Sequence, residues 1–154
     1  LLEYAYNHRS QGKALQWNEG IHDQSYRFYP DGKQGHETMP FMTCRIVDVK
    51  GALEQIPYPK DSSGSLVFHT EDPLADWNTG TFTLTVSEGK GTVAATPYAK
   101  ADASMPIGTL ALLVFGAMDV NALVFCEKLQ GTDEALKKIE AFFPTEKCYI
   151  NEWY

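Results

Sequence analysis

The residues with the clearest chemical potential stand at the end of the sequence. Glu152, Trp153 and Tyr154 combine two large aromatic rings with a side-chain carboxylate and an α-carboxylate. Chain ends are usually polar and frayed, so this pattern predicts a short strand that delivers an aromatic residue and its carboxylate to a defined place. A partly buried carboxylate can accept a proton or attract a cation. The alternative is that Trp153 and Tyr154 only dock the tail onto a sheet.

Histidine and cysteine are the other residue types with available chemistry, and their spacing forms no metal motif. The four histidines are His8, His22, His36 and His69. The three cysteines are Cys44, Cys126 and Cys148. The spread of the histidines favours surface or hydrogen-bonded side chains and no metal site. Because each cysteine has apolar neighbours, we expect buried, reduced thiols.

The most distinctive internal stretch runs from Asp72 to Gly80 and contains Asp-Pro and Asn-x-Gly, which are typical of turns. Trp77 lies between these turn signals and is too large to be left loose. The pattern predicts a wide hairpin loop that folds over Trp77 as a hydrophobic lid. A loop that contacts a ligand is the alternative.

The amino-acid composition limits the classes of protein to which the chain can belong. The chain has 154 residues, 44% of them hydrophobic, and a formal net charge of −7. The acidic balance argues against nucleic acid, which favours a basic stripe, and is compatible with cationic substrates. The longest apolar run, Ile107 to Val114, is too short to span a membrane. We therefore expect a globular cytoplasmic protein with no membrane partner.

Residues 1–41 differ from the rest of the chain. Leu1 begins in mid-pattern without an initiator Met, residues 1–11 resemble the end of a helix, and short strands are predicted at residues 26–29 and 39–42. This stretch has too few apolar residues for its own core. We expect it to be the C-terminal tail of a preceding domain, in a chain that is the C-terminal piece of a longer protein.

Residues 42–154 read as a complete small domain. Strands are predicted at residues 44–49, 66–69, 81–86, 92–96 and 102–105, with a hairpin turn at residues 87–90. A helix is predicted at residues 50–56, and three more follow between Ile107 and Phe143, where apolar residues recur at helical spacing. Because strands come first and helices follow, the fold class is α+β, a mainly antiparallel sheet covered on one face by helices.

The helical segments carry recognisable start and stop signals. Asp119 is placed to cap one helix, and Gly116 to end the helix before it. Residues 132–134 open the last helix with acids in its first turn, and Pro144 stops it. The region from Ile107 to Leu129 is rich in Leu, Val, Phe and Met. It predicts ordinary core, with a lipid tunnel as the alternative.

At this point several motifs together resemble one family. Residues 42–49 are similar to the Met-x-x-Arg-Ile-Val-Asp-Val opening of the sterol-carrier-like C-terminal domain of enhanced-intracellular-survival acetyltransferases. Asp72-Pro73 with Trp77-Asn78 and Gly80 resembles the Asp-Pro…Trp-Asn-x-Gly loop of that domain. Phe143-Pro144-Thr145 and Tyr154 resemble its closing segment. His8-Arg9-Ser10-Gln11 with Gln16-Trp17 is similar to the end of the domain before it, which is acetyltransferase-like.

The resemblance implies an acetyl-CoA-dependent N-acetyltransferase that acts on aminoglycoside, polyamine or lysine amines and assembles as a homo-oligomer, commonly a hexamer. It implies that acetyl-CoA is bound by an N-terminal acetyltransferase domain of the same chain, which is missing here. Arg9 to Ala14 loosely matches an acetyl-CoA loop, but a predicted helix precedes it, so the fragment itself is expected to bind no cofactor.

The resemblance also assigns roles at the end of the chain. The α-carboxylate of Tyr154 would act as the general base, and Trp153 and Glu152 would form part of the substrate wall. Family members often carry their acidic residue immediately before the last residue, whereas Glu152 is shifted by one. Two other functions stay open: a lipid- or sterol-binding carrier module, and a domain that serves only oligomerisation.

Overall fold

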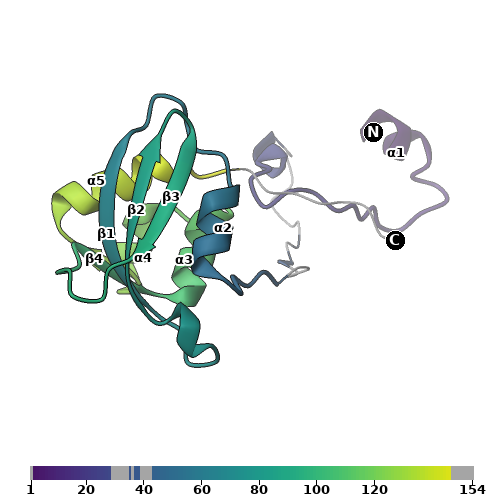
Figure 1. Ribbon diagram of the computed structural model, residues 1–154. Helices are drawn as coiled ribbons and strands as arrows, with labels where there is room; N and C mark the ends of the chain where they lie inside the picture. Colours follow the sequence, from purple (N-terminus) through teal and green to yellow (C-terminus); the bar gives the residue numbers. More distant parts are fainter. Residues whose placement is uncertain (1, 29–34, 36, 39–42, 147–154) are drawn as a thin grey trace. The chain divides into compact units, whose positions relative to one another are not determined.

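The computed structural model describes residues 2–28, 35, 37–38 and 43–146, which divide into two units (Figure 1). The smaller unit contains helix α1 (Leu2–Asn7) and the 3-10 turn η1 (Ser25–Phe28). None of its described residues is buried. The predicted strand at residues 26–29 is wrong, because the side chain of Asp23 accepts a hydrogen bond from the Ser25 N–H at 2.6 Å and starts a turn there. The strand predicted at residues 39–42 lies outside the described residues.

The larger unit is an α+β fold built on a five-stranded sheet of order β3-β2-β1-β4-β5. The strands are β1 (Gly64–Glu71), β2 (Gly80–Ser87), β3 (Lys90–Ala95), β4 (Ala103–Pro106) and β5 (Gln130–Gly131). Every neighbouring pair is antiparallel except β1 and β4, which are parallel. The predicted class, a mainly antiparallel sheet with helices on one face, is confirmed.

Strand β2 shows why the sequence folds this way. Phe82, Leu84 and Val86 alternate with threonines, and the three apolar side chains are buried while Thr85 is exposed. The turn that joins β2 to β3 has positive φ at both central residues, Glu88 at 52° and Gly89 at 77°. Two such residues fit the twist of a tight hairpin. Both strands and their turn are therefore confirmed.

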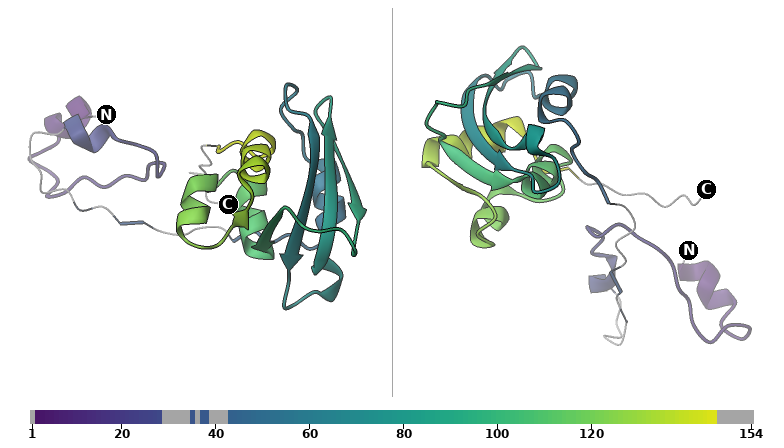
Figure 2. Two further views of the ribbon diagram at one scale, coloured as in Figure 1. Left: turned by 90° about the vertical axis from the view of Figure 1, so that its left-hand side faces the viewer. Right: turned by 60° about the horizontal axis from the view of Figure 1, so that its bottom comes forward.

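Helices α3 (Ile107–Val114), α4 (Val120–Phe125) and α5 (Asp133–Phe142) form a layer on one face of the sheet (Figure 2). Their predicted ends are confirmed. Asp119 accepts from the Ala122 N–H at 2.8 Å and Thr132 accepts from the Ala135 N–H at 3.2 Å. Gly116, with φ of 61°, follows α3. These helices bury a contiguous apolar core against the sheet.

Helix α2 (Val49–Gln55) lies beside β3, which is at one edge of the sheet (Figure 1). Its Glu54 carboxylate accepts from the Val93 N–H at 3.0 Å, and the Lys50 ammonium donates to the Val93 carbonyl at 3.0 Å. Edge strands expose unpaired backbone groups that invite other chains. The two side chains of α2 therefore satisfy an edge position that would otherwise be open.

Two sequence predictions on this unit need correction. Residues 43–48 form no strand, although residues 44–49 have strand-like composition. Cys44 and Cys126 are exposed, not buried, and Cys148 lies outside the described residues. Cys126 follows the short helix α4 at its exposed end, so apolar neighbours in sequence do not bury it. No helix in the described part of the chain is long and apolar enough to span a membrane.

Candidate functional site

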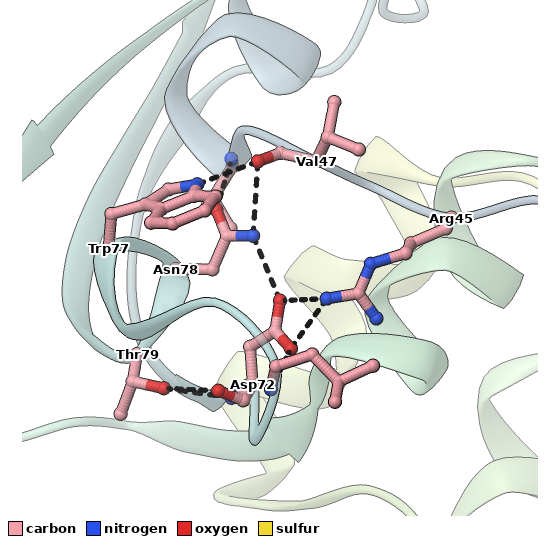
Figure 3. A network of polar contacts seen from close by, with 8 residues as sticks. Arg45, Val47, Asp72, Trp77, Asn78 and Thr79 are labelled. Atoms are coloured by element: carbon pink, nitrogen blue, oxygen red, sulfur yellow. Dashed lines mark hydrogen bonds and ion pairs between the residues drawn. The ribbon is translucent and has the colours of Figure 1, made fainter.

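A network of polar contacts joins the end of β1 to the segment that leads into α2 (Figure 3). At its centre is Asp72, whose side chain is inaccessible to solvent. Nη2 of Arg45 lies 2.7 Å from both carboxylate oxygens of Asp72. The Asn78 amide donates to the same carboxylate at 2.9 Å and the Leu74 N–H at 3.0 Å. A buried carboxylate is thus fully surrounded by donors.

Asn78 connects this carboxylate to the incoming backbone. Its side chain accepts from the Val49 N–H at 3.1 Å and donates to the Val47 carbonyl at 3.2 Å. It is completely buried. The amide therefore serves residues 47–49 as a neighbouring strand would, which explains why this extended segment has no strand partner.

Trp77 adds a second contact to the Val47 carbonyl through its indole N–H, at 2.8 Å. The ring is nevertheless 71% exposed. The predicted hydrophobic lid is therefore wrong: the loop is held by the buried polar side chains of Asp72 and Asn78, and the indole is fixed at the surface. Thr79 closes the loop, since its hydroxyl accepts from the Asp72 N–H at 2.9 Å.

The electrostatics of the network favour an ionised Asp72 carboxylate. The hydrogen bond from Asn78, followed by that from Arg45, lowers the pKa of the Asp72 carboxyl below its usual value, although burial acts in the opposite direction. A carboxylate with a lowered pKa and all its acceptor sites occupied is a poor general base. The network positions the loop and the segment 45–49 and has no evident catalytic group.

A groove of about 380 Å³ borders this network. It is formed by the segment 45–48, one side of α2 and the end of α3. Its lining residues are Arg45, Ile46, Val47, Asp48, Gly51, Ala52, Gln55, Ile56, Val114 and Phe115. The walls are mainly apolar, and the Arg45 guanidinium supplies the positive charge. Nε and Nη1 of Arg45 bond to none of the residues that the structure describes.

His69 alternates along β1 with the buried Phe68 and Thr70, so it points to the opposite face of the sheet and is partly exposed. Its Nδ1 is 3.2 Å from the Thr81 hydroxyl and its Nε2 is 3.9 Å from a Glu71 carboxylate oxygen. This hydrogen-bonded histidine fits the sequence-based interpretation. Within the described ranges, no group of three His, Cys, Asp or Glu side chains could hold a metal ion.

The predicted site residues Glu152, Trp153 and Tyr154 lie outside the described residues, so their assignment stays a prediction. Sequence reasoning missed the pairing of Arg45 with Asp72 across 27 positions. A signal was present: Arg45 is the one cation in the otherwise apolar run from Cys44 to Val47, and an acid follows directly after β1. Sequence alone could not show that the two meet.

With this geometry established, comparison with known proteins places the chain in a family. The family model described as sterol carrier protein domain matches residues 49–151, about two thirds of the chain. The chain belongs to the sterol carrier protein domain family. The match covers the whole sheet and helix layer of this sterol carrier protein domain.

Solved structures similar to this sterol carrier protein domain include a GCN5-related N-acetyltransferase and a probable N-acyltransferase. A GCN5-related N-acetyltransferase from Anabaena variabilis ATCC 29413 is 28% identical with a TM-score of 0.70, over 94% of this chain and 37% of its own. A probable N-acyltransferase from Enterococcus faecalis V583 is 27% identical with a TM-score of 0.68, over 79% of this chain and 31% of its own.

Eis1 from Mycobacterium abscessus is 25% identical with a TM-score of 0.56, over 67% of this chain and 25% of its own. No curated protein sequence matches the chain significantly. The domain therefore spans between a quarter and about two fifths of the length of these solved relatives.

Proposed function

We propose that this chain is the C-terminal part of an acetyl-CoA-dependent N-acetyltransferase that acts on amines, of the enhanced-intracellular-survival type. The observation that carries the proposal is the similarity to the Anabaena N-acetyltransferase, which extends over 94% of this chain at 28% identity. The motif resemblances at residues 42–49 and 72–80 support it. So do the likenesses to the Enterococcus protein and to Eis1.

Acetyl-CoA is proposed to bind to a part of the protein that precedes this chain. A pyrophosphate loop presents backbone N–H groups where a helix begins. Arg9 to Ala14 do not fit such a loop, because they follow helix α1 and residues 14–20 form no helix. This chain would instead contribute the substrate wall, with Glu152 and Trp153, and contacts between subunits.

The α-carboxylate of Tyr154 is proposed as the general base. An amine with a pKa near that of Lys, about 10.4, is protonated at neutral pH and must lose a proton before it becomes a nucleophile. An α-carboxylate, with a reference pKa of about 3.3–3.7, is a weak base in water. Burial beside aromatic rings would raise its pKa and improve the match. Attraction of the ammonium group would help to position the substrate.

One added residue tests this role in the full-length protein. A Gly after Tyr154 moves the terminal carboxylate by about 3.5 Å while keeping its charge. We expect kcat/KM for amine acetylation to fall by about 100-fold or more. The matched control Tyr154→Phe keeps the carboxylate in place and should lose little. Unchanged turnover of the extended protein would remove this carboxylate from the mechanism.

The oligomer size of variants at the chain end, measured in solution, separates a role in catalysis from a role in assembly. If the domain serves only oligomerisation, Trp153→Ala and Tyr154→Ala will change oligomer size and leave activity per site intact. The general-base proposal expects the Gly extension to lower the activity per site and to leave oligomer size unchanged.

A lipid-carrying function is the second candidate, because the family model carries the name sterol carrier protein domain. A tunnel wide enough for an acyl chain would leave its lining accessible to a water-sized sphere. Leu84 of the sheet and Leu123 and Ile139 of the helices belong to one buried cluster and have no accessible surface. The packing of these residues weighs against a tunnel there. Mass spectrometry of gently purified protein tests it: stoichiometric bound lipid would favour the carrier.

A further inference from the structure

The surface around the groove has the composition of a protein interface. Trp77 is 71% exposed, Leu74 79% and Val47 68%. The indole N–H of Trp77 donates to the Val47 carbonyl, and Val47 also lines the groove, so Trp77 adjoins the groove through Val47. Leu74 is exposed on the same loop as Trp77. We call Val47, Leu74 and Trp77 with the groove the groove surface. Trp and Arg side chains dominate the binding energy of many interfaces, and this surface contains one of each.

The groove surface is also preorganised. Val47, which carries two hydrogen bonds on its carbonyl, cannot shift without breaking the contacts from Trp77 and Asn78. The loop that presents Trp77 and Leu74 is fixed by the buried carboxylate of Asp72. A partner that binds here therefore orders few side chains and loses little conformational entropy. Isolated exposed apolar residues are common, but a rigidly held set of them beside a groove is typical of an interaction site.

The chemistry of the groove surface indicates which groups a bound partner would present to it. Apolar side chains would fill the groove against Ile56 and Val114. An acceptor oxygen, from a carboxylate or a carbonyl, would meet Nε and Nη1 of Arg45, whose third nitrogen is already held by Asp72. Arg presents its donors in a planar fork suited to such oxygens.

We propose that the groove surface docks the acetyltransferase part of the same polypeptide, an inference that rests on the proposed function. The solved relatives extend well beyond this domain: the Anabaena protein matches the chain with 37% of its length, so most of its residues have no counterpart here. A tethered partner reaches an effective concentration in the mM range. A tethered partner can therefore bind an open groove that offers only a few exposed apolar side chains.

Cross-linking in the full-length protein tests the identity of the occupant. In a background in which Cys44, Cys126 and Cys148 are replaced by Ser, Val47→Cys places a thiol at the rim of the groove and leaves the backbone contacts intact. After attachment of a photoreactive maleimide, irradiation and peptide mapping, we expect cross-links to peptides upstream of this chain. A mixture of ¹⁴N and ¹⁵N protein distinguishes cross-links within one copy from cross-links between two copies. Cross-links between differently labelled copies would assign the surface to a second copy and overturn the proposal.

Thiol labelling provides an independent readout that does not depend on enzyme activity. Docking should make Val47→Cys react with maleimide at least about tenfold more slowly than the native exposed Cys126. Trp77→Ala in that background should raise the rate again, whereas Tyr98→Ala, which removes a fully exposed aromatic ring elsewhere, should not. Equal labelling of both thiols would overturn the proposal. Protection with cross-links upstream but no acetyl transfer would refute the proposed function and retain the docking.

Discussion

Arg45 and Asp72 are 27 positions apart, yet one nitrogen of the arginine lies 2.7 Å from both oxygens of the aspartate, whose side chain has no solvent access. This contact closes the network that fixes the loop carrying Trp77 and the segment entering α2. Because breaking one partner of a buried pair leaves an uncompensated charge, the network offers sharp tests.

Asp72 should make the domain sensitive to acid. Its pKa is lowered in the folded state by Asn78 and Arg45, so its contribution to stability is complete above about pH 4, its ordinary pKa. The contribution is lost as the pH falls through the lower folded-state pKa. We expect the urea midpoint of Asp72→Asn to be lower than that of the original protein at neutral pH and to decline less between about pH 5 and pH 2. Asp76→Asn, an exposed acid in the same loop, should keep the original profile.

Asn78→Ala should destabilise the domain by about 2–3 kcal/mol, since it leaves the buried Val49 N–H without its partner and removes a donor from Asp72. Urea unfolding measures this loss. Asn121→Ala, an exposed change on α4, should stay within about 0.5 kcal/mol. Equal effects of the two substitutions would contradict the role given to the network.

Thr70→Val should stabilise the domain by about 1 kcal/mol. Thr70 is fully buried between Gly80 and Met105, and its hydroxyl has no hydrogen-bond partner among the residues that the structure describes. Valine has the same shape without the unpaired polar group. Thr70→Ser keeps the hydroxyl and loses the methyl group, so it should destabilise. A lower melting temperature for the valine variant would indicate a hidden partner such as a buried water.

Two glycines should respond to alanine in opposite directions. A Cβ at Gly91 would lie 2.6 Å from the Tyr58 ring and 2.8 Å from the Leu53 carbonyl oxygen, so Gly91→Ala should cost about 1–3 kcal/mol or more. A Cβ at Gly108, inside α3, meets nothing within 4 Å. Gly108→Ala should gain up to about 1 kcal/mol from helix propensity. Thermal unfolding of the matched pair gives the comparison, and a stabilised Gly91→Ala would refute the close packing of β3 on α2.

The local pattern of the sequence was sufficient for most elements of residues 43–146. The alternation of threonine with Phe82, Leu84 and Val86 predicts β2. The capping side chain of Asp119 and the acids at residues 133–134 predict where α4 and α5 begin. These features depend on neighbours within a few positions, so the sequence contains all that is needed to recognise them.

Long-range contacts decided the rest. Residues 44–49 have the composition of a strand, but the Asn78 side chain occupies the backbone groups that a strand partner would need. The parallel pairing of β1 with β4 and the exposure of Trp77 depend likewise on residues distant in sequence. The sequence by itself determined the elements and their buried faces, because propensity and periodicity are local. The tertiary structure alone decided which polar groups meet, because a buried carboxylate is stable only where the whole fold brings its donors to it.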